Sequence, residues 1–134
     1  MLQIHNINTN LTWTDARQSC QSLAANGRGE LASVHDQETN EFLSSLTQVD
    51  SWLGGYQDDQ DNWMWSDGSI WNYANWGPNL PDDCCGGEDY LQTNFHLASN
   101  IGIWNDLPLK HHFIVGYICQ YDVLEEYSSK ILLD

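Results

Sequence analysis

The chain has 134 residues, a length that suits one compact domain with a single hydrophobic core. It carries 4 Lys and Arg against 19 Asp and Glu, and the resulting net charge of -15 disfavours nucleic acids and anionic membranes as partners, because both present negative phosphate. No apolar run approaches the length of a membrane span, so we expect no membrane insertion.

A first helix is predicted from a capping box at its N-terminus. Thr12 precedes Asp15 by three residues, the spacing at which side chains cap the first helical turn. The glycines at positions 27 and 29 end the pattern. Apolar residues recur at helical spacing, and we expect the following to face the core: Trp13, Ala16, Cys20, Leu23 and Ala24.

A second helix is predicted to begin near Ser33 or Asp36, both of which are good N-cap residues. Residues 30–34 form a short strand or an extended link before it. We expect the inward-facing residues of this helix to be Phe42, Leu43 and Leu46.

The remainder of the chain is predicted to contain short strands separated by clusters of Gly, Asn, Asp and Pro. Helices followed by strands, rather than alternating with them, indicate an α+β domain. The predicted strands are residues 51–55, 63–66, 90–93, 101–104 and 113–121.

Residues 72–88 have no periodicity, and a structureless stretch of this length in a small domain is usually functional. No Lys or Arg occurs between Arg28 and Lys110. Carboxylates gathered without cations repel one another, and a hard divalent cation such as Ca²⁺ relieves the repulsion; the alternative is a solvated acidic surface. The acids in this interval include Asp58, Asp59, Asp61, Asp67, Asp82, Asp83, Glu88, Asp89 and Asp106.

The four cysteines form an even set in a small domain, which indicates an oxidising compartment and a secreted protein. We assign residues 1–122 to the folded domain and residues 123–134 to a C-terminal tail with apolar residues at roughly helical spacing. The tail is expected to pack on the body or on a second subunit, and the working hypothesis for the oligomeric state is a homodimer.

Segments along most of the chain, in the right order, resemble the signatures of one known family. The most specific are Trp52-Leu53-Gly54-Gly55 and Trp104-Asn105-Asp106; the others are residues 13–20, 29–35, 75–76, 87–89 and 116–119. On these motifs, residues 11–121 resemble the C-type lectin-like domain. The resemblance implies an α+β fold with two helices, two small antiparallel sheets and a long irregular binding loop.

The resemblance also implies a disulfide between Cys20 and Cys119, which closes a long loop and is expected to stabilise the fold by about 4–5 kcal/mol. Cys84 and Cys85 then remain within the long loop. They either close a strained ring with each other or pair with a partner chain, and we favour the ring. A zinc site is disfavoured, because no other Cys or His has matching spacing.

In calcium-binding members of the family, one ion is held by a triplet with a central proline, a later Glu and the Asn-Asp of the Trp-Asn-Asp motif. The resemblance places the triplet at residues 80–82, with a cis Leu80–Pro81 bond. The implied ligands of the ion, which are also sugar-binding residues, are Asp82, Glu88, Asn105 and Asp106. Leu80 departs from the pattern, because an alkyl group cannot ligate.

Three outcomes follow from Leu80: calcium binds with water in the gap, sugar binds without calcium, or sugar binding is lost. Asp82 resembles the galactose type of triplet. A shifted triplet at residues 77–79 is disfavoured, because it changes the spacing from Trp76 and also lacks the first ligand.

A second, structural calcium is also implied, with Asp83 and Asp89 as ligands together with Asp58 or Asp61; the alternative is that these acids are solvated. His96, His111 and His112 are expected near strand ends on one side of the domain. Of these, His96 and His111 are our candidate sugar-binding residues, with an imidazole stacked against an N-acetyl group. Three tryptophans are assigned to the core rather than to ligand binding: Trp65, Trp71 and Trp104.

The interpretation is therefore a non-enzymatic lectin that binds glycans of the galactose/GalNAc or GlcNAc type, with or without Ca²⁺. No Ser/His/Asp or Cys/His arrangement has a context that favours catalysis. The alternative is a lectin-like domain without sugar binding that recognises proteins or a mineral or ice surface.

Overall fold

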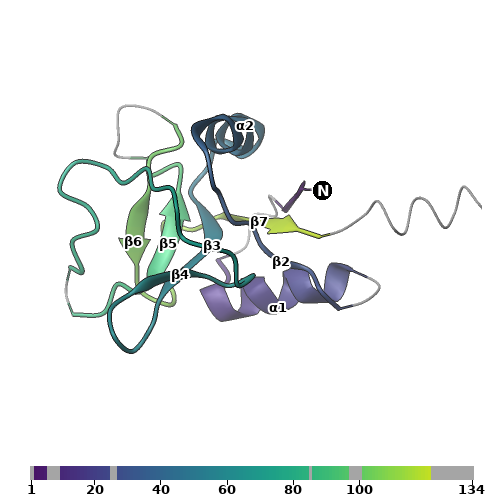
Figure 1. The fold of residues 1–134 in the computed structure, drawn as a ribbon, viewed down its shortest axis with the longest axis horizontal. Coiled ribbons are helices and arrows are strands. Elements are labelled where there is room, and N and C mark those ends of the chain that lie inside the picture. The colour runs from purple at the N-terminus through teal and green to yellow at the C-terminus, as the bar shows by residue number, and fades with distance from the viewer. Residues whose placement is uncertain (1, 6–9, 25–26, 85, 97–100, 122–134) are drawn as a thin grey trace, which may run out of the picture.

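The computed structural model describes residues 2–5, 10–24, 27–84, 86–96 and 101–121 (Figure 1). Two helices lie against a sheet, with α1 along one side of it and α2 along another. None of the described helices is long and apolar enough to span a membrane. The elements are β1 (Leu2–His5), α1 (Trp13–Leu23), β2 (Glu30–Leu31), α2 (Gln37–Thr47), β3 (Ser51–Gln57), β4 (Trp63–Trp65), β5 (Tyr90–Thr93), β6 (Asn105–Leu107) and β7 (Gly116–Gln120).

Helix α1 begins as its capping box predicts. The Thr12 hydroxyl accepts a hydrogen bond from the backbone N–H of Asp15 at 3.0 Å, which satisfies one of the free donors of the first turn. The helix buries Trp13, Ala16 and Cys20, as expected. Leu23 is an exception, since it is exposed in the last turn, where the helix ends before reaching the glycines.

Helix α2 is capped by Asp36, whose carboxylate accepts from the N–H of Thr39 at 2.7 Å. The predicted inward face was wrong at two of three positions: Leu43 is buried, but Phe42 is 53% exposed and Leu46 is 50% exposed. The buried stripe consists of Asn40, Leu43, Ser44 and Thr47. Polar residues occupy it because they find partners inside the protein: the Asn40 amide donates to the carbonyl of Gly102 and accepts from the indole N–H of Trp104.

The strands form one mixed sheet in the order β1-β7-β3-β5-β6, with β2 paired to β7 and β4 paired to β3. We expected two small antiparallel sheets. They are joined because β3 runs parallel to β7 over two pairs, Ser51 with Gly116 and Trp52 with Tyr117. Strand β1, which the sequence analysis did not predict, adds an antiparallel edge to β7.

Four predicted strands agree closely with β3, β4, β5 and β7, but the strand predicted at residues 101–104 is not formed. Gly102 has a positive φ of 82°, which interrupts an extended backbone. The strand β6 begins at Asn105, three residues after Gly102. Trp104 makes only an isolated bridge to Trp76.

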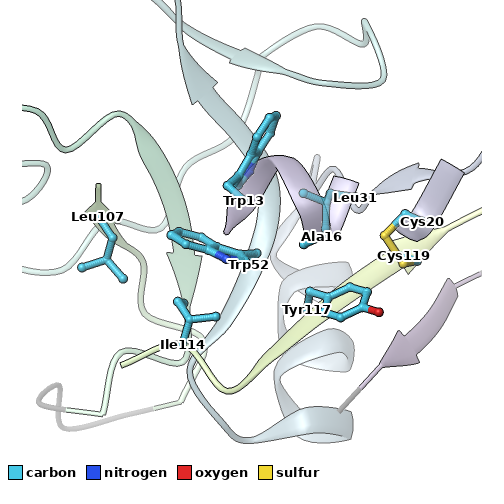
Figure 2. Packing of buried hydrophobic residues seen from close by; sticks show 9 residues of the cluster. All are labelled: Trp13, Ala16, Cys20, Leu31, Trp52, Leu107, Ile114, Tyr117 and Cys119. Carbon is cyan, nitrogen blue, oxygen red and sulfur yellow. A yellow bond between two sulfur atoms is a disulfide. The ribbon is translucent and has the colours of Figure 1, made fainter. Parts of the chain in front are cut away.

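The core consists of two clusters. The first surrounds Trp52 between α1 and the sheet, and contains the predicted disulfide between Cys20 and Cys119, with Cα atoms 5.3 Å apart (Figure 2). The second cluster lies toward the long loop and contains Trp65 and Trp104, with Trp71 packed against it. Trp65 and Trp104 are therefore core residues, as predicted, whereas Trp71 is only partly buried.

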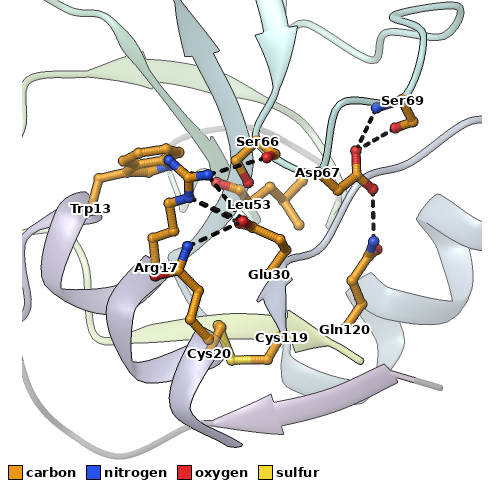
Figure 3. A network of polar contacts seen from close by, with 11 residues as sticks. Trp13, Arg17, Cys20, Glu30, Leu53, Ser66, Asp67, Ser69, Cys119 and Gln120 are labelled. Atoms are coloured by element: carbon orange, nitrogen blue, oxygen red, sulfur yellow. Dashed lines mark hydrogen bonds and ion pairs between the residues drawn. A yellow bond between two sulfur atoms is a disulfide. The ribbon is translucent and has the colours of Figure 1, made fainter. Parts of the chain in front are cut away.

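Polar contacts hold α1, β2 and β7 to the segment after β4, and we call this part of the molecule the body (Figure 3). Arg17 forms an ion pair with Glu30 at 2.9 Å and donates to the carbonyl of Ser66. The Asp67 carboxylate accepts from the hydroxyls of Ser33 and Ser69, from the N–H of Ser69 and from the Gln120 amide: its partners are polar but uncharged.

Candidate functional site

The long loop is fixed to the core at Trp76. The N–H of Trp104 donates to the carbonyl of Asn75 at 2.9 Å, and the N–H of Gly77 donates to the carbonyl of Trp104 at 3.0 Å. The Trp76 ring packs edge-on against Trp104 and against Trp63. Because Trp104 directly precedes β6, these contacts hold the loop beside the start of that strand.

The structure brings three of the predicted ligands together. Carboxylate oxygens of Asp82, Glu88 and Asp106 all lie within 4.8 Å of one another, and we call these residues the acid cluster. Asp82 and Glu88 come from the long loop, whereas Asp106 lies on β6 opposite Leu91 of β5. This is the only group of three such ligand atoms found among the described residues.

Asp106 orders the loop above it. One of its carboxylate oxygens accepts from the N–H of Asp82 at 3.1 Å, and the other accepts from the N–H of Asp83 at 2.8 Å. The loop closes on itself through the N–H of Cys84, which donates to Asp82 Oδ1 and to Glu88 Oε1. The backbone of the loop therefore points its donors at the carboxylates of the cluster.

No Lys, Arg or His in the described part of the chain forms an ion pair with the acid cluster. Desolvation, a hydrogen bond with Asp82 and repulsion from Asp106 and Asp82 raise the pKa of Glu88 to about 8. Burial also raises the pKa of Asp106, although the N–H groups of Asp83 and Asp82 oppose the shift. Negative charge at this site is thus unfavourable without a cation, and the donor set of hard oxygens fits Ca²⁺.

Asn105, the fourth predicted ligand, is buried directly before Asp106. Its side-chain N–H donates to Oε1 of Gln92 at 3.0 Å, so the amide oxygen is directed away from Gln92. Gln92 was not identified from the sequence as part of the site. The signal that was available is a glutamine within the short strand at residues 90–93, flanked by the buried Leu91 and Thr93.

The Leu80–Pro81 peptide bond is cis, as predicted. The half-buried Leu80 side chain lies beside Gly77, where an added Cβ would lie 3.1 Å from Leu80 Cδ1 and 3.0 Å from Ile103 Cγ2. Leu80 thus contributes an apolar contact at the base of the loop.

The residues predicted to hold a second ion are not gathered in the same way. Asp58 accepts from the N–H groups of Gln60 and Asn62 in its own turn. Burial and the charges of Asp83 and Asp61 raise the pKa of Asp89, which places these acids near one another. Among the described residues they do not form a group with three ligand atoms within 4.8 Å.

The three histidines gather around Phe113, with ring centroids 4.5 Å away for His96, 4.2 Å for His111 and 4.7 Å for His112. His111 also lines a pocket of about 210 Å³ beside Glu88 and Pro108. Burial and the neighbouring His112 lower the pKa of His111. His96 is engaged elsewhere, with Nδ1 2.7 Å from Asp50 Oδ2.

Two predictions lie outside the described residues. Residue 85 is not described, so the pairing of Cys84 with Cys85 stays a prediction. Residues 122–134 are likewise not described, and the division of the chain into residues 1–122 and 123–134 stays a prediction as well.

The family model for the lectin C-type domain matches residues 9–107. A lectin from Pleurodeles waltl is 33% identical over 117 residues, which cover 82% of this chain and 64% of that protein. The type-2 ice-structuring protein of Hemitripterus americanus is 35% identical over 105 residues, which cover 75% of this chain and 57% of that protein. The chain therefore spans less than two thirds of either relative.

Two solved structures with a similar fold are likewise a carbohydrate-recognition domain and an antifreeze protein. The carbohydrate-recognition domain of cow CD23, solved in the presence of a GlcNAc2Man3 oligosaccharide, is 26% identical with a TM-score of 0.73, and the match covers 88% of this chain and 84% of that chain. Herring type II antifreeze protein is 31% identical with a TM-score of 0.71, and the match covers 88% and 87%.

Proposed function

Because the chain belongs to the C-type lectin domain family, we propose that it binds a terminal sugar at a calcium site formed by the acid cluster and Asn105. The observation that carries the proposal is the convergence of three carboxylates within 4.8 Å of one another, without a cationic partner in the described part of the chain. A calcium ion, when bound, would accept about 6–8 oxygen ligands, and two vicinal sugar hydroxyls could provide some of them.

The chain's own residues have separable roles in this proposal. Asp106 holds the backbone of Asp82 and Asp83 through its two oxygens, so it shapes the site as well as charging it. Glu88 and Asp82 supply the remaining negative charge from the loop, and both also serve as acceptors for sugar hydroxyls. Leu80 supplies no ligand atom, so water would have to provide an oxygen in its place when the ion is bound.

We infer a sugar of the galactose, GalNAc or GlcNAc type. Asp82 in the triplet supports the galactose type, and the pocket beside Glu88 supports an N-acetyl substituent, because its wall includes the His111 ring. His96 is the second histidine of the proposal. Its Nδ1 lies 2.7 Å from Asp50 and its side chain is 43% exposed, so the exposed part of the ring would contact the sugar.

Glycan-array binding, measured with excess Ca²⁺ and again with EDTA, tests the proposal. We expect binding that EDTA abolishes, and loss of binding in Glu88→Gln but not in the control Glu38→Gln, which removes an exposed acid on α2. Binding that persists in EDTA would shift the proposal to direct contacts, with His111→Ala as the next variant. Absence of sugar binding in a protein that still binds calcium would contradict the lectin function.

A second candidate function is binding to an ice or mineral surface or to a protein. It is supported by the identity of 35% to an ice-structuring protein and by the acidic composition. Inhibition of ice or calcium-salt crystal growth, with and without EDTA, separates this function from sugar binding.

Three further properties belong to the proposal. Asp83 and Asp89, together with Asp58 or Asp61, would hold a second ion, so calorimetry is expected to give two calcium ions per chain, and a single ion would remove the second site. The disulfide between Cys20 and Cys119 supports secretion, since such bonds persist in oxidising compartments.

A homodimer would increase avidity for clustered glycans, and sedimentation velocity tests it.

A further inference from the structure

A chain of hydrogen bonds leads from the candidate calcium site into the protein. The Asn105 amide N–H donates to Gln92 Oε1 at 3.0 Å, and the Gln92 amide N–H donates to Asp50 Oδ1 at 2.6 Å. Gln92 and Asn105 lie directly opposite each other on β5 and β6, and Gln92 is 0% exposed. A buried amide of this kind is costly unless it is bonded at both ends, which Gln92 is.

Asp50 forms the fixed end of this chain. Asp50 Oδ1 also accepts from the backbone N–H of His96 at 2.9 Å, and Asp50 Oδ2 lies 2.7 Å from His96 Nδ1. The Asp50 carbonyl accepts from the N–H of Val115 at 3.0 Å. The His96 ring in turn packs edge-on against Phe113 at 4.5 Å. The carboxylate therefore has neighbours on several sides that fix its position.

The direction of the hydrogen bonds follows from the chemistry of the Asp50 carboxylate. An ionised carboxylate only accepts, whereas an amide presents a donor on one side and an acceptor on the other. Asp50 thus requires the NH₂ group of Gln92, which turns Gln92 Oε1 toward Asn105. Asn105 must then present its own NH₂ group to Gln92. Its oxygen accepts none of the hydrogen bonds found between described residues.

We propose that Asp50 and Gln92 are positioning residues that select the amide direction of Asn105, so that oxygen rather than NH₂ faces the calcium site. The inference rests on the proposed function, since a metal ligand requires the oxygen. Without this selection, the two directions of the Asn105 amide would compete, and one of them places a donor where a cation binds. Partners of metal ligands commonly affect affinity by about 10–100-fold when they are changed.

The test is a set of variants of the whole chain, titrated with Ca²⁺ alone by calorimetry. Asp50→Asn replaces the obligate acceptor with a group of the same size that can also donate, and we expect calcium affinity to fall roughly tenfold. Gln92→Glu places two carboxylates against each other, and a similar loss is expected. The double variant D50N/Q92E keeps the net charge and restores the direction, because the carboxylate introduced at position 92 would accept from both Asn105 and the new amide at position 50. We expect its affinity to return to within about threefold of the parent.

A second readout does not need the ion. In chelated protein, the Asn105 side-chain NH₂ protons should exchange slowly in the parent and in the double variant, and faster in Asp50→Asn. Thermal melting of each variant with EDTA identifies any that simply fail to fold. Parent-like calcium affinity in Asp50→Asn, or no recovery in a folded double variant, would overturn the inference. A parent chain that binds no calcium would overturn the proposed function instead, and the exchange rates would then decide the amide direction by themselves.

Discussion

The carboxylates of the body and those of the acid cluster differ in their partners, and the pKa values of Asp67 and Glu88 shift in opposite directions. In the body, Glu30 is paired with Arg17, and the half-buried Asp67 has several donors around it. Burial by itself raises the pKa of Asp67, but hydrogen bonds from Ser33, Ser69 and Gln120 outweigh it, and the net shift is downward. In the loop, the acid cluster has no cationic partner among the described residues, and the pKa of Glu88 is raised to about 8.

The difference shows what each group of acids does for the protein. A carboxylate with a lowered pKa stabilises the folded state at neutral pH, as Asp67 does in the body. Carboxylates held together against their repulsion oppose folding, so the acid cluster is maintained by the surrounding structure. A site that the fold holds in this way is available to a ligand of opposite charge.

The largest expected effect separates the two regions by weakening only the body. Replacing both cysteines of the Cys20–Cys119 bond with serine opens a link between residues 99 apart in sequence. We expect the free energy of unfolding to fall by about 4–5 kcal/mol, measured by urea titration. Calcium affinity of the molecules that remain folded should change less than about threefold, because the acid cluster lies outside the body. A loss below about 1 kcal/mol would contradict the assignment.

The second prediction makes a matched change in each region. Asp67→Asn disturbs a fully bonded acid, and we expect a loss of about 1–2 kcal/mol in the free energy of unfolding. Glu88→Gln removes an acid whose charge is opposed, so stability measured in EDTA should stay the same or rise. Calcium affinity should respond in the reverse order, with a loss of at least about tenfold for Glu88→Gln and little change for Asp67→Asn. Equal losses of stability in EDTA would remove the contrast between the regions.

The third prediction concerns pH. Because the folded-state pKa of Glu88 is raised to about 8, the stability associated with its proton is fully present below about pH 4.5 and is lost as pH rises through 8. In EDTA, the melting temperature is therefore expected to decline across this window, and in Glu88→Gln the decline should be smaller. The shift of Asp67 has the opposite sign, so its contribution is present at neutral pH and is lost on acidification. Identical pH profiles for the parent and Glu88→Gln would contradict the raised pKa.

The smallest effect is expected outside both regions, on the outer face of α2. Phe42→Ser changes a side chain that is 53% exposed, and the free energy of unfolding should change by less than about 0.5 kcal/mol. Leu43→Ala, one position along the same helix, is the control, with an expected loss of about 2–4 kcal/mol. Similar losses of stability in the two variants would indicate that Phe42 faces the core, as predicted from the sequence.

Local chemistry allowed much of the fold to be predicted. The caps at Thr12 and Asp36 and the strand at Tyr90–Thr93 depend on neighbouring residues, and they are observed where the sequence places them. The cis bond at Leu80 and the Cys20–Cys119 pair were implied by the resemblance to the C-type lectin-like domain, not by local chemistry, and both are observed.

The errors have a common physical cause: each concerns a residue whose partners lie far away in the sequence. Apolar periodicity placed Phe42 inside, but Asn40 is the buried residue, because its partners Gly102 and Trp104 come much later in the chain. Strand β1 depends on pairing with β7 at the other end of the domain, and so short a strand carries too little signal by itself.

The candidate site was predictable only in part, and for the same reason. Spacing within the family placed Asp82, Glu88 and Asp106 together, which the structure reproduces. The hydrogen bonds through Gln92 and Asp50 were not foreseen, because they join residues from separate segments whose meeting depends on the sheet.

The pairing of β1 with β7 has a consequence for how the domain can be attached to anything else. Leu2 lies opposite Gln120, so the two ends of the described fold leave from neighbouring strands at one end of its long axis, while the loop of residues 70–84 lies toward the other end (Figure 1). A support, a fluorescent protein or a further domain joined at either end would therefore leave the acid cluster facing outward. Chains anchored side by side in this manner would present their loops as an array, which is the geometry that a multivalent surface needs.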